Sequence, residues 1–169
     1  MRYETKSVRC LGIDPGIANC GWSVVGRYAS GYRLISDGII KTDCKRATSD
    51  RLLAIYQQLS EVVQHETPNL IAIERCFHNK NVTSSMKTGA VIGIVLLVAA
   101  QFGCEVVELT PQQVKAATGL GGNANKKAVQ RMMCKIFQRE HLNHHVADAA
   151  ACAIAGLLHG KRIDGAIAG

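Results

Sequence analysis

The sequence predicts an α/β fold built on a five-stranded mixed sheet, in which three antiparallel strands are followed by parallel crossovers and helices flank the sheet. Two observations lead to this prediction. Three segments with strand-like patterning follow one another over short links near the N-terminus. Beyond residue 49, helical periodicity alternates with short apolar runs, which is typical of parallel crossover connections. With 169 residues, 47% of them apolar, residues 1–169 have the size of a single domain.

The first three predicted strands form a meander. Residues 8–13 are an apolar run that Asp14, Pro15 and Gly16 bring to an end. Residues 21–26 and 32–41 are the second and third strands, with a glycine-containing turn between them. Links this short favour antiparallel pairing.

A helix and a buried strand come next. Ser49 and Asp50 can cap a helix that runs to about residue 65. Its apolar side chains recur with helical spacing and form one stripe: Leu52, Leu53, Tyr56, Leu59, Val62 and Val63. Residues 70–73 are continuously apolar, which predicts a short strand covered on both faces.

The second half of the chain alternates helices and one more strand. Thr110 and Pro111 have the residue types of an N-cap and a first helical position. The helix at 84–101 is apolar on nearly all sides, which predicts burial within the monomer or against a second copy. The remaining predicted elements are a strand at 104–109, a basic helix at 126–137 and an alanine-rich helix at 145–159.

Charge and cysteine content narrow the class of protein. The formal net charge of +7 favours a polyanionic partner, such as nucleic acid or an anionic membrane surface. The seven cysteines are widely spaced and form no CxxC pair, so they do not predict a zinc site. Their odd number and the lack of a signal-like start favour a reducing compartment, and we expect a cytoplasmic protein. The longest apolar run, residues 90–100, is too short to cross a bilayer.

Three acids lie where apolar elements end or begin. Asp14 follows the first strand and Glu74 follows the strand at 70–73, so both carboxylates are expected at the carboxyl edge of the sheet, where α/β proteins bind ligands. Asp148 lies on the otherwise apolar last helix, with His145 three residues before it on the same face. Carboxylates grouped in this way are suited to Mg²⁺ or Mn²⁺, and two ions per site would serve phosphodiester hydrolysis.

Each of these residues also has a simpler explanation. Asp14 can cap its own Pro-Gly turn, and Glu74 can pair with Arg75 or a nearby lysine. Asp148 can interact with the helix macrodipole, and His145 can lie near the N-cap without a further role. The conjunction of all four favours the metal site.

Four segments occur in an order and spacing that resemble RuvC-type Holliday junction resolvases, which have the RNase H-like fold. They are L-G-I-D-P-G (11–16), A-I-E-R-C-F-H-N-K-N (72–81), P-Q-Q-V-K (111–115) and H-V-A-D-A (145–149). The resemblance implies a homodimeric endonuclease that cuts four-way DNA junctions by paired symmetric nicks, using divalent metal ions. It also implies that Asp14, Glu74, His145 and Asp148 are the metal-binding catalytic set.

The same resemblance suggests residues that contact DNA. Phe77 resembles an aromatic residue that stacks near the exchange point of the junction, and the helix at 84–100 resembles the family's dimer helix. Most of the basic residues lie in the second half of the chain. The simpler explanation is that they form a solvent-exposed helix face. Because they accompany the acid cluster, we predict instead that they contact the DNA backbone. The predicted DNA-binding set is Phe77, Asn79, Lys80, Lys87, Lys115, Lys126, Lys127 and Arg131.

The sequence departs from the family pattern in two places. His145 stands where some members have Asp, which predicts a preference for Mn²⁺ because imidazole suits that ion better than Mg²⁺. Ile92 stands where many members have Arg in the dimer helix. A different alignment of the last motif would place Asp148 at the earlier position and Ala151 at the later one, leaving a defective site.

Other functions therefore stay open at this point. An RNase H-like nuclease acting on branched DNA or structured RNA would use the same acids. A protein that binds junctions without cutting them would result from a defective last motif. An actin-like ATPase is disfavoured because that fold needs a second domain and a second glycine-rich phosphate loop. A branch-migration helicase is a possible partner.

Overall fold

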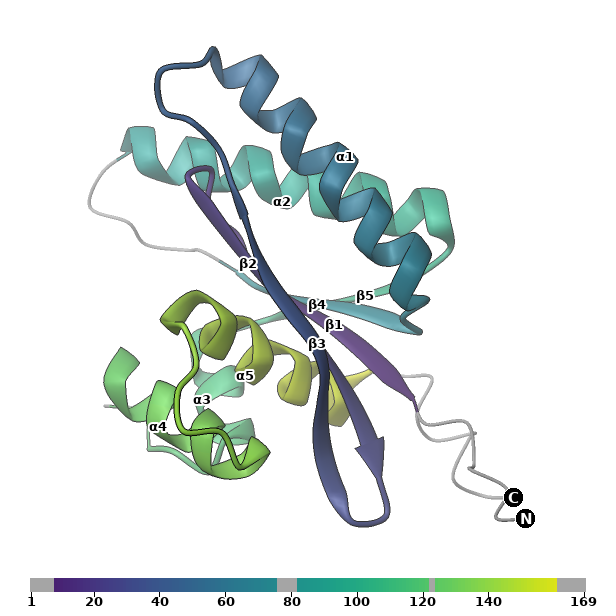
Figure 1. Cartoon of the computed structure of the whole chain (residues 1–169), viewed down its shortest axis with the longest axis vertical. Coiled ribbons are helices and arrows are strands. Elements are labelled where there is room, and N and C mark those ends of the chain that lie inside the picture. Colours follow the sequence, from purple (N-terminus) through teal and green to yellow (C-terminus); the bar gives the residue numbers. More distant parts are fainter. Residues whose placement is uncertain (1–7, 76–81, 122–123, 161–169) are drawn as a thin grey trace.

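The computed structural model describes residues 8–75, 82–121 and 124–160, and it contains the predicted five-stranded mixed sheet (Figure 1). The strand order across the sheet is β3-β2-β1-β4-β5. β1 pairs antiparallel with β2 and β2 with β3, while β1–β4 and β4–β5 are parallel. The strands are β1 (Arg9–Asp14), β2 (Asn19–Tyr28), β3 (Gly31–Lys41), β4 (Leu70–Glu74) and β5 (Glu105–Leu109).

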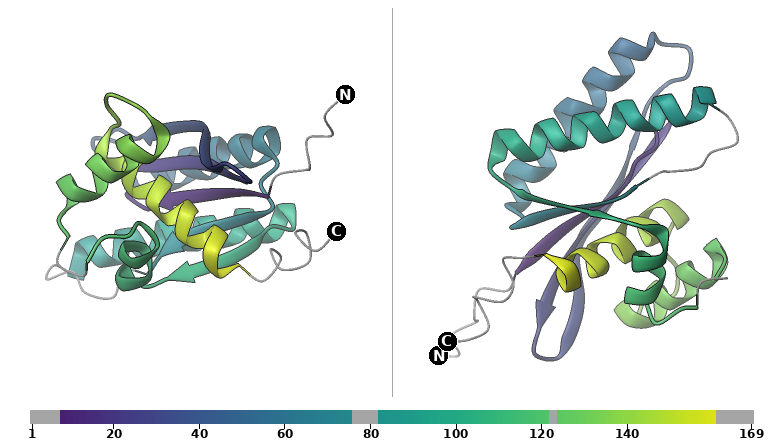
Figure 2. Two further views of the ribbon diagram at one scale, coloured as in Figure 1. Left: turned by 90° about the horizontal axis from the view of Figure 1, so that it is seen from below. Right: turned by 180° about the vertical axis from the view of Figure 1, so that it is seen from behind.

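Helices cover both faces of this sheet (Figures 1 and 2). α1 (Thr48–Glu66) and α2 (Val82–Phe102) pack on one face, and α5 (His144–His159) crosses the other. α3 (Pro111–Ala117) and α4 (Lys126–Phe137) pack against α5. The fold class predicted from the sequence is therefore confirmed.

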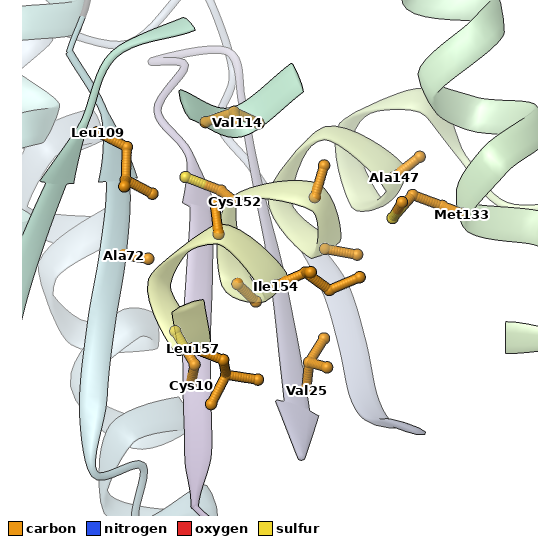
Figure 3. Packing of buried hydrophobic residues seen from close by; sticks show 14 of the residues in the cluster. Cys10, Val25, Ala72, Leu109, Val114, Met133, Ala147, Cys152, Ile154 and Leu157 are labelled. Carbon is orange, nitrogen blue, oxygen red and sulfur yellow. The ribbon is translucent and has the colours of Figure 1, made fainter. Parts of the chain in front are cut away.

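The central strands separate two apolar cores. Leu70 and Ala72 of β4 point to the α5 side, and Ile71 and Ile73 point to the side of α1 and α2. All four side chains are buried, as the continuous apolar run predicts. Figure 3 shows the α5 side, where Ile154 and Leu157 pack over Cys10, Val25 and Ala72.

The backbone of α5 lies unusually close to β1 and β2. A Cβ atom added at Gly12 would collide with the Ala149 carbonyl oxygen and the Ala153 backbone nitrogen. A Cβ at Gly21 would lie 2.5 Å from the carbonyl oxygen of His145. The alanine-rich sequence of α5 permits this approach, because small side chains add little bulk between helix and sheet. The glycines and alanines together set the height of α5 above the sheet.

Helix α1 corrects two predictions. It begins at Thr48 rather than at the Ser49–Asp50 pair, and its N-cap residue Ala47 supplies no side-chain hydrogen bond. The predicted stripe is correct except at Leu53, which is 54% exposed: Leu59 and Val63 are buried, and Leu52, Tyr56 and Val62 pack against the same core while partly exposed. The buried stripe consists of Arg51, Ile55, Leu59 and Val63. The stripe differs from the predicted one because an arginine occupies its first position, where the aliphatic stem packs like an apolar side chain.

The start of α3 is confirmed in detail. Thr110 accepts a hydrogen bond from the Gln113 backbone nitrogen, and the Gln113 side chain accepts one from the Thr110 backbone nitrogen. This reciprocal pair is a capping box, and Pro111 follows at the first helical position.

Of the two predicted ways of burying α2, burial within the monomer accounts for one face only. Val91, Val95, Val98 and Ala99 are buried against the domain, and the opposite face is open. By length and composition alone α2 is also a candidate membrane span, although one face of it packs into the domain.

We expect Gly12→Ala to lower the free energy of unfolding by about 3 kcal/mol, because the new methyl group must displace the α5 backbone. Urea unfolding followed by circular dichroism measures the change. Gly121→Ala is the matched control, since nothing lies within 4 Å of a Cβ at that position. Equal stability of the two variants would show that the close contact of α5 and β1 is relaxed in solution.

Candidate active site

Asp14 and Glu74 are the last residues of β1 and β4. These strands are parallel neighbours, and Ile13 pairs with Ile73 in their register. The next residue of each strand is the acid, so the two carboxylates lie at the same edge of the sheet. This arrangement is the one expected from the positions of the acids at strand ends.

The first turns of α5 bring His145 and Asp148 to the same edge. The Ser23 hydroxyl of β2 donates a hydrogen bond of 2.9 Å to the carbonyl oxygen of Val146, and Ser23 is fully buried. Asn143 is the N-cap and accepts from the His145 backbone nitrogen at 2.9 Å. The position of α5 therefore depends on a polar contact with the sheet as well as on apolar packing.

Two side-chain pairs link these acids to basic groups. His145 Nδ1 lies 2.7 Å from Asp14 Oδ2, and both side chains are about a quarter exposed (23% and 28%). Lys126 Nζ of α4 lies 3.6 Å from Asp148 Oδ2. Asn125, the N-cap of α4, accepts from the Ala128 backbone nitrogen and so sets the direction of the helix that carries Lys126.

The three carboxylates line one cavity of about 660 Å³. Two of the predicted DNA-contacting cations, Lys115 of α3 and Lys126, line the same cavity. Thr88 of α2 contributes from the opposite side of the sheet edge. His145 is not among the lining residues, but it contacts Asp14, which is one of them.

Burial and mutual repulsion disfavour the charged forms of two of these acids. The pKa of Glu74 is raised, first by burial and then by the charges of Asp148 and Asp14, while Lys115 and Lys126 lower it. The pKa of Asp148 is also raised, mainly by burial and by Asp14, against the lowering effect of Lys126. The lowering effect of the lysines beside the cavity is therefore outweighed by burial together with the neighbouring carboxylates.

A divalent cation fits this donor set, because hard cations bind carboxylate oxygens and would relieve both causes of the raised pKa values. Within residues 8–75, 82–121 and 124–160, no three His, Cys, Asp or Glu side chains are clustered tightly enough to enclose an ion. Asp14 is bonded to His145 and Asp148 lies near Lys126 instead. The donor chemistry agrees with the prediction, and the carboxylates open onto one cavity.

The other predicted DNA-binding residues do not line this cavity: three are exposed on α2 and α4, and three lie outside the described residues. Lys87 is exposed beside Thr88, which lines the cavity, and Lys127 and Arg131 are exposed on α4. Phe77, Asn79 and Lys80 lie within 76–81, outside the described residues.

Sequence reasoning missed Ser23 and Gly21. The glycine precedes Trp22 in an ordinary strand pattern, and a serine in such a strand has no local signal of a partner 123 residues away. Both contacts depend on how α5 crosses the sheet, which the local sequence does not encode.

The comparisons with known proteins agree with this geometry. Residues 10–156 match the family model described as crossover junction endodeoxyribonuclease RuvC. A RuvC protein of Bartonella tribocorum is 34% identical over 160 residues, covering 94% of each chain. One of Alkaliphilus metalliredigens is 40% identical over 146 residues, covering 85% of this chain and 89% of the other. The solved structure of Thermus thermophilus RuvC in complex with Holliday junction substrate has a TM-score of 0.81 and 27% identity, with 92% of this chain and 96% of that chain covered.

We expect Asp148→Asn to raise the free energy of unfolding of the protein in EDTA at neutral pH, because it removes a charge that burial and Asp14 disfavour. A raised carboxyl pKa means that the folded state binds its proton more tightly than the unfolded state. The gain should therefore be largest above the raised pKa and shrink as the pH falls through it. Thermal unfolding across pH measures this, and a less stable variant at neutral pH would contradict it.

Proposed function

The chain belongs to the RuvC family of crossover junction endodeoxyribonucleases, and on that premise we propose that it resolves four-way (Holliday) DNA junctions by paired symmetric nicks. The observation that carries this proposal is the cavity in which Asp14, Glu74 and Asp148 meet beside Lys115 and Lys126. In such a cavity the carboxylates can bind metal ions, and the two lysines can bind a phosphate group. The Thermus thermophilus RuvC solved with Holliday junction substrate supports the choice of substrate.

Nucleases of this family depend on divalent metal ions. We assign Asp14, Glu74 and Asp148 as the residues that would hold them, with His145 completing the set. When bound, the ions supply Lewis-acid chemistry for hydrolysis of the phosphodiester. The number of ions, two per site, and the preference for Mn²⁺ stay predictions.

The residues of the chain bind and orient the substrate around this centre. Lys115 and Lys126 place positive charge at the cavity, where they can hold the phosphate of the strand to be cut. His145 keeps Asp14 in one orientation through the 2.7 Å contact. The acids are half-buried, so the reacting phosphate would meet a partly dehydrated site in which charge interactions are strong.

The contact between His145 and Asp14 also bears on the defective-site alternative. In that alignment Ala151 would occupy a catalytic position. His145 lies against Asp14, and Asp148 opens onto the cavity with Glu74, so H-V-A-D presents a complete polar set. This favours cleavage over binding alone.

We propose that the protein is a homodimer and that α2 forms its interface. One row of exposed positions on the outer side of α2 contains only apolar residues and glycines, at intervals of three or four: Val82, Met86, Gly89, Gly93, Leu97 and Ala100. Met86 is 71% exposed and Leu97 58%. Apolar rows with this spacing pack against a second helix, and the two glycines allow close approach. A branch-migration helicase partner and the cytoplasmic location stay predictions.

Cleavage by Asp14→Asn should fall about a hundredfold or more, while binding of a four-way junction stays near the wild-type level. The neutral side chain keeps the shape of Asp14 but removes its charge from the proposed metal set. A labelled synthetic junction, incubated with Mg²⁺ or Mn²⁺ and resolved on a denaturing gel, measures the nicks and their symmetry.

Asp37→Asn is the control, because Asp37 is an exposed acid on β3. Duplex DNA and structured RNA are the competing substrates, since they separate junction resolution from a broader nuclease activity. Unchanged nicking by Asp14→Asn would refute the catalytic assignment, and wild-type binding without nicking would favour the non-cleaving alternative.

Leu97→Asp should convert a dimer into monomers, because a carboxylate cannot be buried between two apolar helix faces at low cost. Light scattering coupled to gel filtration gives the mass, and the junction assay should show loss of paired nicks. Leu158→Asp is the matched control, because Leu158 is also an exposed leucine (49%) but lies at the end of α5. A dimer that survives Leu97→Asp would place the interface elsewhere.

A further inference from the structure

The first turn of α1, just after the segment that joins β3 to this helix, contains a buried charge without a counter-ion. Arg51 is 7% exposed, yet within the described residues it forms no ion pair with any carboxylate. Its Nε donates a hydrogen bond of 2.8 Å to Thr42 Oγ1. A buried guanidinium is normally paired, because its desolvation is costly.

The tip of this guanidinium remains accessible. In the described part of the chain, the buried side-chain nitrogens and oxygens without a partner are the hydroxyls of Ser36 and Ser60, and the terminal nitrogens of Arg51 are not among them. They therefore keep a small contact with solvent, within the 7% of the residue that is exposed, while the stem packs in the stripe with Ile55 and Leu59. The side chain is thus held in place at Nε and open at its outer end.

The accessible tip is at the same edge of the sheet as Asp14. The Thr42 hydroxyl donates to the carbonyl oxygen of Ile17, and the Thr42 backbone nitrogen donates to that of Ala18 at 3.1 Å. These bonds join the β3–α1 connection to the β1–β2 turn, which begins directly after Asp14. Figure 1 shows the connection and this turn close together, with α3 and α4 beyond the other face of the sheet.

Further positive charge surrounds Arg51. Lys41, Lys45 and Arg46 are exposed on the same connection. Two acids oppose them: Asp50 lies 3.5 Å from Arg46, and Asp43 accepts a hydrogen bond from the Lys45 backbone nitrogen. Residues 41–51 therefore hold four cations and two acids, and keep a surplus of positive charge.

We propose that Arg51, with Lys41 and Lys45, binds a phosphate of the DNA backbone on the side of the cavity opposite to Lys115 and Lys126. A guanidinium already held at Nε presents its terminal N–H groups to phosphate with little loss of side-chain entropy. Cations on both sides of the carboxylates would hold one strand across Asp14. This inference rests on the proposed function for its substrate, although a phosphate contact does not require a junction.

The test is the salt dependence of DNA binding, measured by fluorescence anisotropy of a labelled four-way junction in EDTA. Arg51→Gln should weaken binding severalfold and reduce the slope of log affinity against log salt by about 0.9, the value for one lost phosphate contact. Arg51→Lys should keep the wild-type slope, because it keeps the charge. Arg33→Gln is the matched control, since Arg33 stacks on Tyr28 near the far end of the hairpin.

A folded Arg51→Gln protein with wild-type affinity and slope would overturn the proposal. If that variant does not fold, Lys41→Gln combined with Lys45→Gln tests it at exposed positions, and an unchanged slope again overturns it. If the wild type fails to cut junctions, the proposed function fails, and the same salt series on duplex DNA still decides the role of Arg51. On duplex DNA, a smaller salt-dependence slope for Arg51→Gln than for the wild type supports the phosphate contact, and an equal slope overturns it.

Discussion

The close contact between α5 and the central strands is the constraint on which the rest of the site depends. At Gly12 and Gly21 the sheet has no side chain, which leaves room for the α5 backbone, and the buried Ser23 hydroxyl bonds to the Val146 carbonyl. Asp14 belongs to the strand and Asp148 to the helix, so their separation is set by this contact. A helix even slightly higher above the sheet would separate the carboxylates and leave their charges independent.

The site gathers three carboxylates in a partly buried place beside two lysines. Lys115 and Lys126 stand beside three carboxylates, two of which have raised pKa values through burial and mutual repulsion. This local excess contrasts with the overall charge of +7. The fold concentrates acids at one point of a basic protein, which is the arrangement that attracts cations to the cavity and phosphate to its rim. The buried cysteines Cys10, Cys20 and Cys152 belong to the packing instead: burial raises the pKa of Cys20 to about 12 and that of Cys152 well above its usual value.

The sequence predicted most of the elements because their signals are local. The end of β1 at Asp14, the continuous apolar strand β4 and the Thr110–Pro111 helix start each depend on a few adjacent residues. The failures share a different cause. The stripe of α1 includes Arg51 because Thr42 accepts its Nε, and the outer face of α2 is open although its residues are as apolar as those inside. Both depend on what another element places opposite the helix.

By itself, the sequence determined the fold class, the order of the strands along the chain and the four polar residues of the proposed catalytic set. Periodicity and chain-breaking residues act over a few positions, so they can be recognised without knowing the fold. Tertiary structure alone decided that His145 bonds to Asp14, that Lys126 faces Asp148, that Ser23 bonds to the start of α5 and that Arg51 bonds to Thr42. These pairs join residues as much as 131 positions apart. Their distances follow from how helices pack on the sheet, and that packing is a property of the whole chain.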